Sequence, residues 1–186
     1  MSDFGIIGIG RIGTSMARNM SSKGIKVSLY DKSHNSLVNL KSNYPELESS
    51  LVFDDINKFI SSISKPRKVL VLVPSGPALD EVISILIEYL DSNDILIDGG
   101  NTNPNVSFEN HQTIKSKNLL YLGMGVSGGV KGVLEGPSIM IGGDTNAFDQ
   151  VKNIFSQITS KTINGSKSFE FFGDSNQGHF VKMIHN

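Results

Sequence analysis

The sequence contains no cysteine, which excludes disulfide bonds and thiolate metal sites. It has no run of about 18 apolar residues, the length that a bilayer-spanning helix needs. Its formal net charge is −1, so no overall field favours nucleic acid or a membrane surface. The first ten residues enter an apolar run without a basic segment or a cleavage site. We therefore expect a cytoplasmic protein that holds no metal and binds neither nucleic acid nor membrane.

The chain does contain enough residues for one domain of ordinary size. It has 186 residues, of which 38% are hydrophobic. Strand-like and helix-like segments alternate along it, without a linker or a repeat. This alternation predicts a mostly parallel sheet with helices on both faces. We therefore predict one α/β domain over 1–186, doubly wound and of Rossmann type.

The individual elements follow from apolar runs and helical periodicity. Strands are predicted at 4–9, 25–31, 68–73, 94–98, 119–124, 137–143 and 168–173. Helices are predicted at 11–22, 34–43, 54–64, 77–90, 104–117, 144–158 and 175–186. Side chains that can accept from free N–H groups precede three of these helices: Asp54, either Asp144 or Thr145, and Ser175.

The motif GIGRIG places Gly8, Gly10 and Gly13 in the pattern G-x-G-x-x-G, between a predicted strand and a predicted helix. In a dinucleotide-binding turn the first glycine permits the tight bend, the second admits the pyrophosphate, and the third lets helix and strand pack closely. Free N–H groups at the helix start bind the anion. We assign Arg11 and Ile12, inside the motif, to the same coenzyme site. The alternative is a glycine-rich turn without a ligand.

The residue at the end of the second strand selects the coenzyme. Asp31 lies 21 residues after Gly10, where a carboxylate accepts from ribose hydroxyls. Such a carboxylate repels a 2′-phosphate and favours NAD over NADP. Lys32 and Ser33 follow it, and both can hold a phosphate, so NADP stays open as the alternative. A solvated charged turn is the third interpretation.

Four later segments carry a family resemblance: KPRKVLVLV (65–73), ILIDGGN (95–101), GVSGGVKGVLEGPSIMIGG (125–143) and GHFVKMIHN (178–186). In this order and spacing they closely resemble the N-terminal coenzyme domain of 6-phosphogluconate dehydrogenase, over essentially the whole chain. Related β-hydroxyacid dehydrogenases usually carry a serine-threonine pair where residues 99–101 read Gly-Gly-Asn. That difference favours the phosphogluconate branch.

The resemblance implies a reaction and a set of site residues. The family oxidises C3 of 6-phosphogluconate by hydride transfer to a nicotinamide, and the keto acid then loses CO₂ to give ribulose 5-phosphate. Lys182 matches the lysine that takes the C3 hydroxyl proton and later returns a proton. Val73, Pro74 and Asn101 match coenzyme positions. The positions that match substrate-holding residues are Asn101, Ser127, Gly128, Gly129, His185 and Asn186.

Elementary chemistry supports these assignments independently. Ser127 and the two glycines after it can form a small anion-binding loop. A lysine that acts as a base must be neutral, and burial beside the coenzyme favours the neutral form. We expect the apolar neighbours of Lys182 to bury one side of its helix: Phe180, Val181, Met183 and Ile184. We interpret His179 as a packing or capping residue, and we expect His34 and His111 to be solvated.

Departures from the family leave alternatives open. NADP-using members carry Asn-Arg-Thr at 31–33 and Lys at 74, whereas NAD-type members tend to have the Asp and Pro found here. Many members have Ala at the position of Gly10 and Met at that of Ile12. Val130 and Ile141 replace a frequent acidic residue and a frequent proline, which affects loop geometry rather than the fold.

The family also continues beyond the position of Asn186 into a C-terminal helical domain, which is absent from these 186 residues. That domain builds a dimer, anchors the substrate phosphate and supplies a glutamate that acts as the acid. Three interpretations follow: a shortened 6-phosphogluconate dehydrogenase, a stand-alone NAD(P)-binding module or regulator without turnover, or a β-hydroxyacid dehydrogenase whose site a partner chain completes. We expect frayed final residues and a Lys182 that is more exposed than in a complete enzyme.

Overall fold

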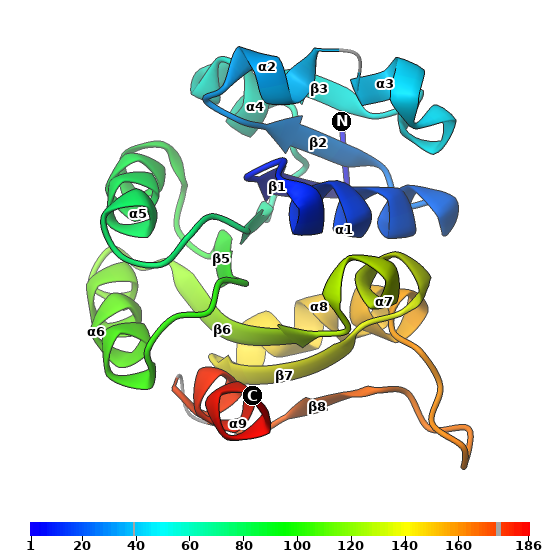
Figure 1. Cartoon of the computed structure of the whole chain (residues 1–186). Helices are drawn as coiled ribbons and strands as arrows, with labels where there is room; N and C mark the ends of the chain where they lie inside the picture. The colour runs from blue at the N-terminus through cyan, green and yellow to red at the C-terminus, as the bar shows by residue number, and fades with distance from the viewer. Residues whose placement is uncertain (39, 174–175) are drawn as a thin grey trace.

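The computed structural model describes residues 1–38, 40–173 and 176–186 (Figure 1). Within these ranges one sheet has the strand order β3-β2-β1-β4-β5-β6-β7-β8. Its strands are β1 (Phe4–Ile7), β2 (Val27–Tyr30), β3 (Leu51–Phe53), β4 (Lys68–Val71), β5 (Ile95–Asp98), β6 (Leu120–Ser127), β7 (Ser138–Gly143) and β8 (Phe169–Phe171). β6 and β7 pair antiparallel, and the other neighbours pair in parallel. The predicted doubly wound, mostly parallel sheet is therefore confirmed.

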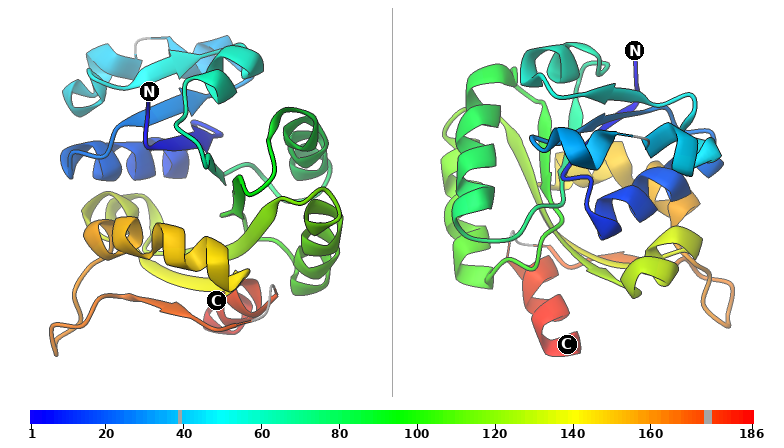
Figure 2. Two further views of the ribbon diagram at one scale, coloured as in Figure 1. Left: turned by 180° about the vertical axis from the view of Figure 1, so that it is seen from behind. Right: turned by 45° about the horizontal axis from the view of Figure 1, so that its top comes forward.

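Helices cover both faces of this sheet. They are α1 (Arg11–Ser22), α2 (His34–Leu37), α3 (Leu40–Asn43), α4 (Ile56–Ser61), α5 (Pro77–Tyr89), α6 (Pro104–Lys115), α7 (Gly129–Glu135), α8 (Thr145–Ile158) and α9 (Gln177–His185), with a 3₁₀ turn at Pro45–Leu47. Figures 1 and 2 show α5 and α6 side by side on one face and α1, α7 and α8 on the other. No helix in the described ranges is long and apolar enough to cross a membrane.

The central strands are mainly apolar because both of their faces are buried, and their charged residues, Lys68 and Asp98, lie at strand ends. Val69 and Val71 of β4 pack into the cluster under α4, α5 and α6. Leu70, between them, points to the opposite cluster under α1, α7 and α8. Successive side chains of a strand alternate between faces, so a strand covered on both sides has few polar positions. This explains why the central strands were predicted well.

The strand order reverses between β1 and β4. β1 continues outward to β2 and β3, whereas β4 continues to β5 and β6. In such a sheet the loops after the central strands diverge at this point, and ligands bind in the crevice that they leave at the carboxyl ends of the strands. The glycine motif follows β1, so it lies at this crevice.

Among the strands and α-helices, β3 and α7 were not predicted. β3 has three residues at the sheet edge, too few for a periodic pattern. α7 contains Gly129, Gly132 and two β-branched valines, a composition of low helix propensity. It packs against α1, with Val133 buried and its carbonyl oxygen 2.9 Å from the donating Asn19 Nδ2. Tertiary contacts thus override local propensity here.

Several predicted helix starts need correction. Asp55 rather than Asp54 caps α4, since its Oδ1 accepts from the Lys58 N–H at 2.9 Å. In place of the helix predicted at 34–43 there are two short helices, α2 and α3, and Asn39 between them lies outside the described residues. Ser175, the predicted cap of the last helix, also lies outside the described residues. Asp144 occupies the N-cap position of α8 without a side-chain capping bond.

Candidate coenzyme and substrate site

The three glycines of the first motif have different local roles. Gly8 has φ +91°, and a Cβ there would lie 2.6 Å from the Leu72 carbonyl oxygen. A Cβ on Gly13 would overlap the Gly8 carbonyl oxygen, so this glycine lets α1 approach β1. A Cβ on Gly10 would meet nothing within 4 Å. The fold therefore requires glycine at the first and third positions, whereas Gly10 leaves open space beside the start of α1.

The first turn of α1 suits an anion. Gly10 is its N-cap and contributes no side-chain bond, and the turn contains no acidic residue. The unpaired N–H groups and the positive end of the helix dipole therefore face the open side of the motif. Arg11 adds a cation at this point, because it lies at the first position of the helix. These features fit the pyrophosphate of a dinucleotide.

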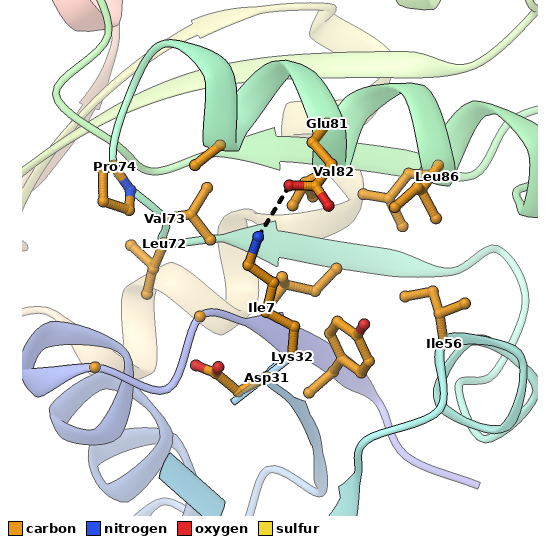
Figure 3. Close-up of a pocket in the computed structure, with 15 residues that line it drawn as sticks. Ile7, Asp31, Lys32, Ile56, Leu72, Val73, Pro74, Glu81, Val82 and Leu86 are labelled. Atoms are coloured by element: carbon orange, nitrogen blue, oxygen red, sulfur yellow. Dashed lines mark hydrogen bonds and ion pairs between the residues drawn. The ribbon is translucent and has the colours of Figure 1, made fainter. Parts of the chain in front are cut away.

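An apolar cavity of about 320 Å³ lies beside this turn, between the carboxyl ends of β1, β2 and β4 and the side of α5 (Figure 3). Ile7, Val73, Pro74 and Val82 contribute to its walls. Apolar walls with a few polar groups at the rim are typical of sites for flat organic rings. The cavity can therefore take the adenosine half of a dinucleotide.

The rim of this cavity carries the residues predicted to select the coenzyme. Asp31 accepts from the Ile9 N–H through Oδ2 and from the Ser33 N–H through Oδ1, both at 2.8 Å. Lys32 Nζ donates to Glu81 Oε2 at 2.9 Å, and this bond and the Glu81 charge raise the pKa of the lysine. Ser33 lines neither this cavity nor the next one. Sequence reasoning missed Glu81, which is 49 residues from Lys32.

A second, more polar cavity of about 960 Å³ adjoins the glycine motif on its other side. Three successive loops after β4, β5 and β6 contribute to it, together with the end of α9. It brings together predicted residues from distant parts of the chain: Gly10, Arg11, Ile12, Gly13, Val73, Pro74, Asn101, Ser127, Gly128, Gly129, Lys182, His185 and Asn186. In the described ranges, no cluster of three or more acidic or histidine side chains is arranged to hold a metal ion.

Lys182 lies at the wall of this cavity with only 9% of its surface exposed. Its Nζ donates to Asn186 Oδ1 at 2.6 Å, one helical turn further on. Its stem lies against β6, where a Cβ on Gly125 would overlap the Lys182 Cβ. A Cβ on Gly178 would likewise overlap the Gly123 carbonyl oxygen. These two glycines, whose role the sequence did not indicate, let α9 lie directly on the sheet.

The prediction that the apolar residues beside Lys182 bury one side of α9 was wrong. Phe180, Met183 and Ile184 are 42%, 51% and 69% exposed, whereas His179 and Lys182 are buried. The reason is the close approach at Gly178, which turns the polar face of the helix toward β6 and β7.

His179 belongs to a buried polar network. Its Nδ1 is 2.9 Å from Ser107 Oγ, which lies 3.0 Å from the Tyr121 hydroxyl. The Tyr121 hydroxyl in turn donates to Asp98 Oδ2 at 3.4 Å. Burial lowers the pKa of His179 and raises that of Tyr121. The network connects α9 through α6 to β5 and β6. His179 is therefore a packing residue, one of the two roles expected from the sequence.

His111 is not solvated, contrary to the prediction. Its Nε2 lies 3.1 Å from Asp144 Oδ2, and its ring stacks on Tyr121 with centroids 5.5 Å apart. Asp144 also accepts from the Tyr121 N–H at 2.8 Å. Burial alone would raise the pKa of Asp144, but these two hydrogen bonds hold it below its usual value. His34 is exposed, as predicted.

The strand order, the glycine turn and the two adjoining cavities define a dinucleotide-binding domain of Rossmann type. Residues 3–166 match the protein family described as the NAD binding domain of 6-phosphogluconate dehydrogenase. The chain belongs to this family, which confirms the resemblance.

Individual relatives agree with this membership. The chain is 37% identical, over 98% of its length, to a decarboxylating 6-phosphogluconate dehydrogenase of Staphylococcus epidermidis, and 36% identical over its whole length to one of Saccharomyces cerevisiae. It spans 39% and 38% of those two proteins. The relatives thus extend well beyond the region that they share with this chain.

Solved structures show the same fold. The 6-phosphogluconate dehydrogenase of Plasmodium falciparum, studied in its apo form and with NADP⁺ or 6-phosphogluconate, matches 99% of the chain with a TM-score of 0.93 and 34% identity. The chain covers 39% of that protein. A 3-hydroxyisobutyrate dehydrogenase of Mycobacterium tuberculosis matches with a TM-score of 0.84 at 19% identity, which concerns the fold alone.

Proposed function

We propose that residues 1–186 form the coenzyme-binding domain of a 6-phosphogluconate dehydrogenase and contribute the base of its reaction. One observation carries this proposal. The larger cavity joins the anion-binding turn of α1 to Lys182 and to the polar residues that resemble the family's substrate site. A dinucleotide with its pyrophosphate at α1 would therefore extend toward the lysine.

In this proposal the chain's own residues orient the substrate and move one proton. A bound nicotinamide supplies the hydride acceptor. Lys182 Nζ takes the proton of the C3 hydroxyl with its lone pair, for which the amine must be neutral; an N–H of the same group can still donate to Asn186 Oδ1. Asn101 and Ser127 offer hydrogen bonds to the hydroxyls and carboxylate of a sugar acid, and the backbone at 128–129 adds N–H donors.

We further propose that the coenzyme is NAD rather than NADP. Two backbone N–H groups fix the Asp31 carboxylate at the rim of the adenosine cavity. There it would accept from a free ribose hydroxyl and repel a 2′-phosphate. The alternative is NADP, which is bound by the Plasmodium falciparum relative.

Calorimetric titration with NAD and NADP tests the coenzyme site directly. A rate assay with 6-phosphogluconate and each coenzyme, on residues 1–186 and on any longer form, tests the reaction. Binding without turnover in every form would favour the alternative of a stand-alone binding module. The absence of any dinucleotide binding would refute both.

A further inference from the structure

We propose that Glu81 on α5 determines coenzyme specificity together with Asp31, by withholding Lys32 from a 2′-phosphate. This inference rests on the coenzyme site proposed above. Figure 3 shows Lys32 reaching from the end of β2 toward α5, where its ammonium meets the Glu81 carboxylate. The pair spans the rim of the adenosine cavity next to Asp31.

Lys32 is the cation of this rim. Among the described residues that line the adenosine cavity, it alone carries a positive charge, whereas Asp31 and Glu81 carry negative ones. Arg11 lines the larger cavity instead. A 2′-phosphate beside Asp31 would therefore have one lysine to bind, and that lysine already has a carboxylate partner.

The negative charges act on the same place. Tyr30 also lines the cavity, and its pKa is raised first by burial and then by the charges of Asp31 and Glu81. Both carboxylates line the same cavity as Tyr30. With Lys32 neutralised, the rim has a net negative charge, which disfavours a phosphate and tolerates an uncharged ribose hydroxyl.

The Lys32–Glu81 pair is exposed, which makes it suitable for a test. The two side chains are 72% and 53% exposed, and exposed ion pairs contribute little to folding. Glu81→Gln removes the charge, keeps the shape and leaves the ammonium of Lys32 free. Glu88→Gln is the matched control, since Glu88 is exposed on the same helix seven residues further on, roughly 10 Å away by the helical rise.

The experiment measures dissociation constants by calorimetry for NAD, NADP, AMP and adenosine 2′,5′-bisphosphate. We expect Glu81→Gln to shift the NADP-to-NAD affinity ratio about tenfold toward NADP, the factor that one charge-assisted hydrogen bond supplies. The affinity ratio of adenosine 2′,5′-bisphosphate to AMP should shift by a similar factor, because these two probes occupy only the adenosine half of the site. The double variant Glu81→Gln/Lys32→Ala should lose this gain.

The outcomes separate the two proposals. An unchanged ratio in Glu81→Gln, an equal shift in Glu88→Gln, or a shift that persists without Lys32 would overturn the role of Glu81 while leaving the coenzyme site intact. If the unaltered chain binds neither dinucleotide, the coenzyme site itself is refuted, and the assignment of Glu81 falls with it.

Discussion

Replacing Gly10 by leucine should weaken dinucleotide binding roughly 100-fold and leave the fold intact. A side chain at this position points into open space, and its φ of −76° is available to any residue. The free energy of unfolding should therefore stay within about 0.5 kcal/mol of its original value, as for other surface substitutions. The same side chain would occupy the space that a pyrophosphate needs at the start of α1. Losing two charge-assisted hydrogen bonds of about 1.5 kcal/mol each would weaken binding roughly 100-fold.

Gly13→Ala, in contrast, should destabilise the fold, although it adds only one methyl group. The new Cβ would overlap the Gly8 carbonyl oxygen, and neither backbone can yield without separating α1 from β1. Overpacking of this kind costs about 1–3 kcal/mol, which exceeds the gain in helix propensity of at most about 1 kcal/mol. Gly132→Ala is the matched control, because it adds the same methyl group to a helix where nothing lies within 4 Å.

The assay for both variants combines urea unfolding, followed by circular dichroism, with calorimetric titration of NAD and NADP. Undiminished affinity in Gly10→Leu would refute the assignment of this turn to the pyrophosphate. A Gly13→Ala protein as stable as Gly132→Ala would refute the reasoning about the contact between α1 and β1.

Three further predictions concern the rest of the site. Asp31→Ala should reduce the preference for NAD over NADP by about tenfold in the same titration, and tighter NADP binding by the unaltered chain would contradict the proposed preference. Residues 1–186 alone should bind coenzyme but turn over 6-phosphogluconate at least about 100-fold more slowly than a longer form. The reason is that a positioned general acid contributes about 10²–10⁴-fold to the rate. Turnover as fast as that of a longer form would mean that another chain supplies the acid. Stability should fall as pH decreases below about 6.5, because burial lowers the pKa of His179 and the unfolded chain then binds the proton more readily, by up to about 1.4 kcal/mol per pH unit. The free energy of unfolding, measured with urea between pH 5 and 8, should depend less steeply on pH in His179→Gln than in the control His34→Gln. An equally steep pH dependence in both variants would contradict the assignment.

The parts of this structure that the sequence predicts well are those with a local cause. The glycine motif lies between a strand and a helix because two of its glycines are required by contacts within that βα unit. The central strands are recognisable because burial on both faces leaves few polar residues in them. The larger cavity follows from motifs at the ends of parallel strands, which meet at one edge of any such sheet.

The parts that the sequence does not predict depend on contacts between distant segments. The pairing of Lys32 with Glu81 needs the position of α5 over the end of β2, which no local pattern contains. The orientation of α9 is a clearer case. Its apolar residues suggest a buried apolar face, and only the close approach at Gly178 reverses this and buries His179 and Lys182 instead. Lys182, the proposed base, is thereby held against the sheet by the close approach of α9 to β6 at Gly178 and Gly125, and not by its apolar neighbours in the helix. Its position therefore depends on a contact between two segments that are distant in the sequence.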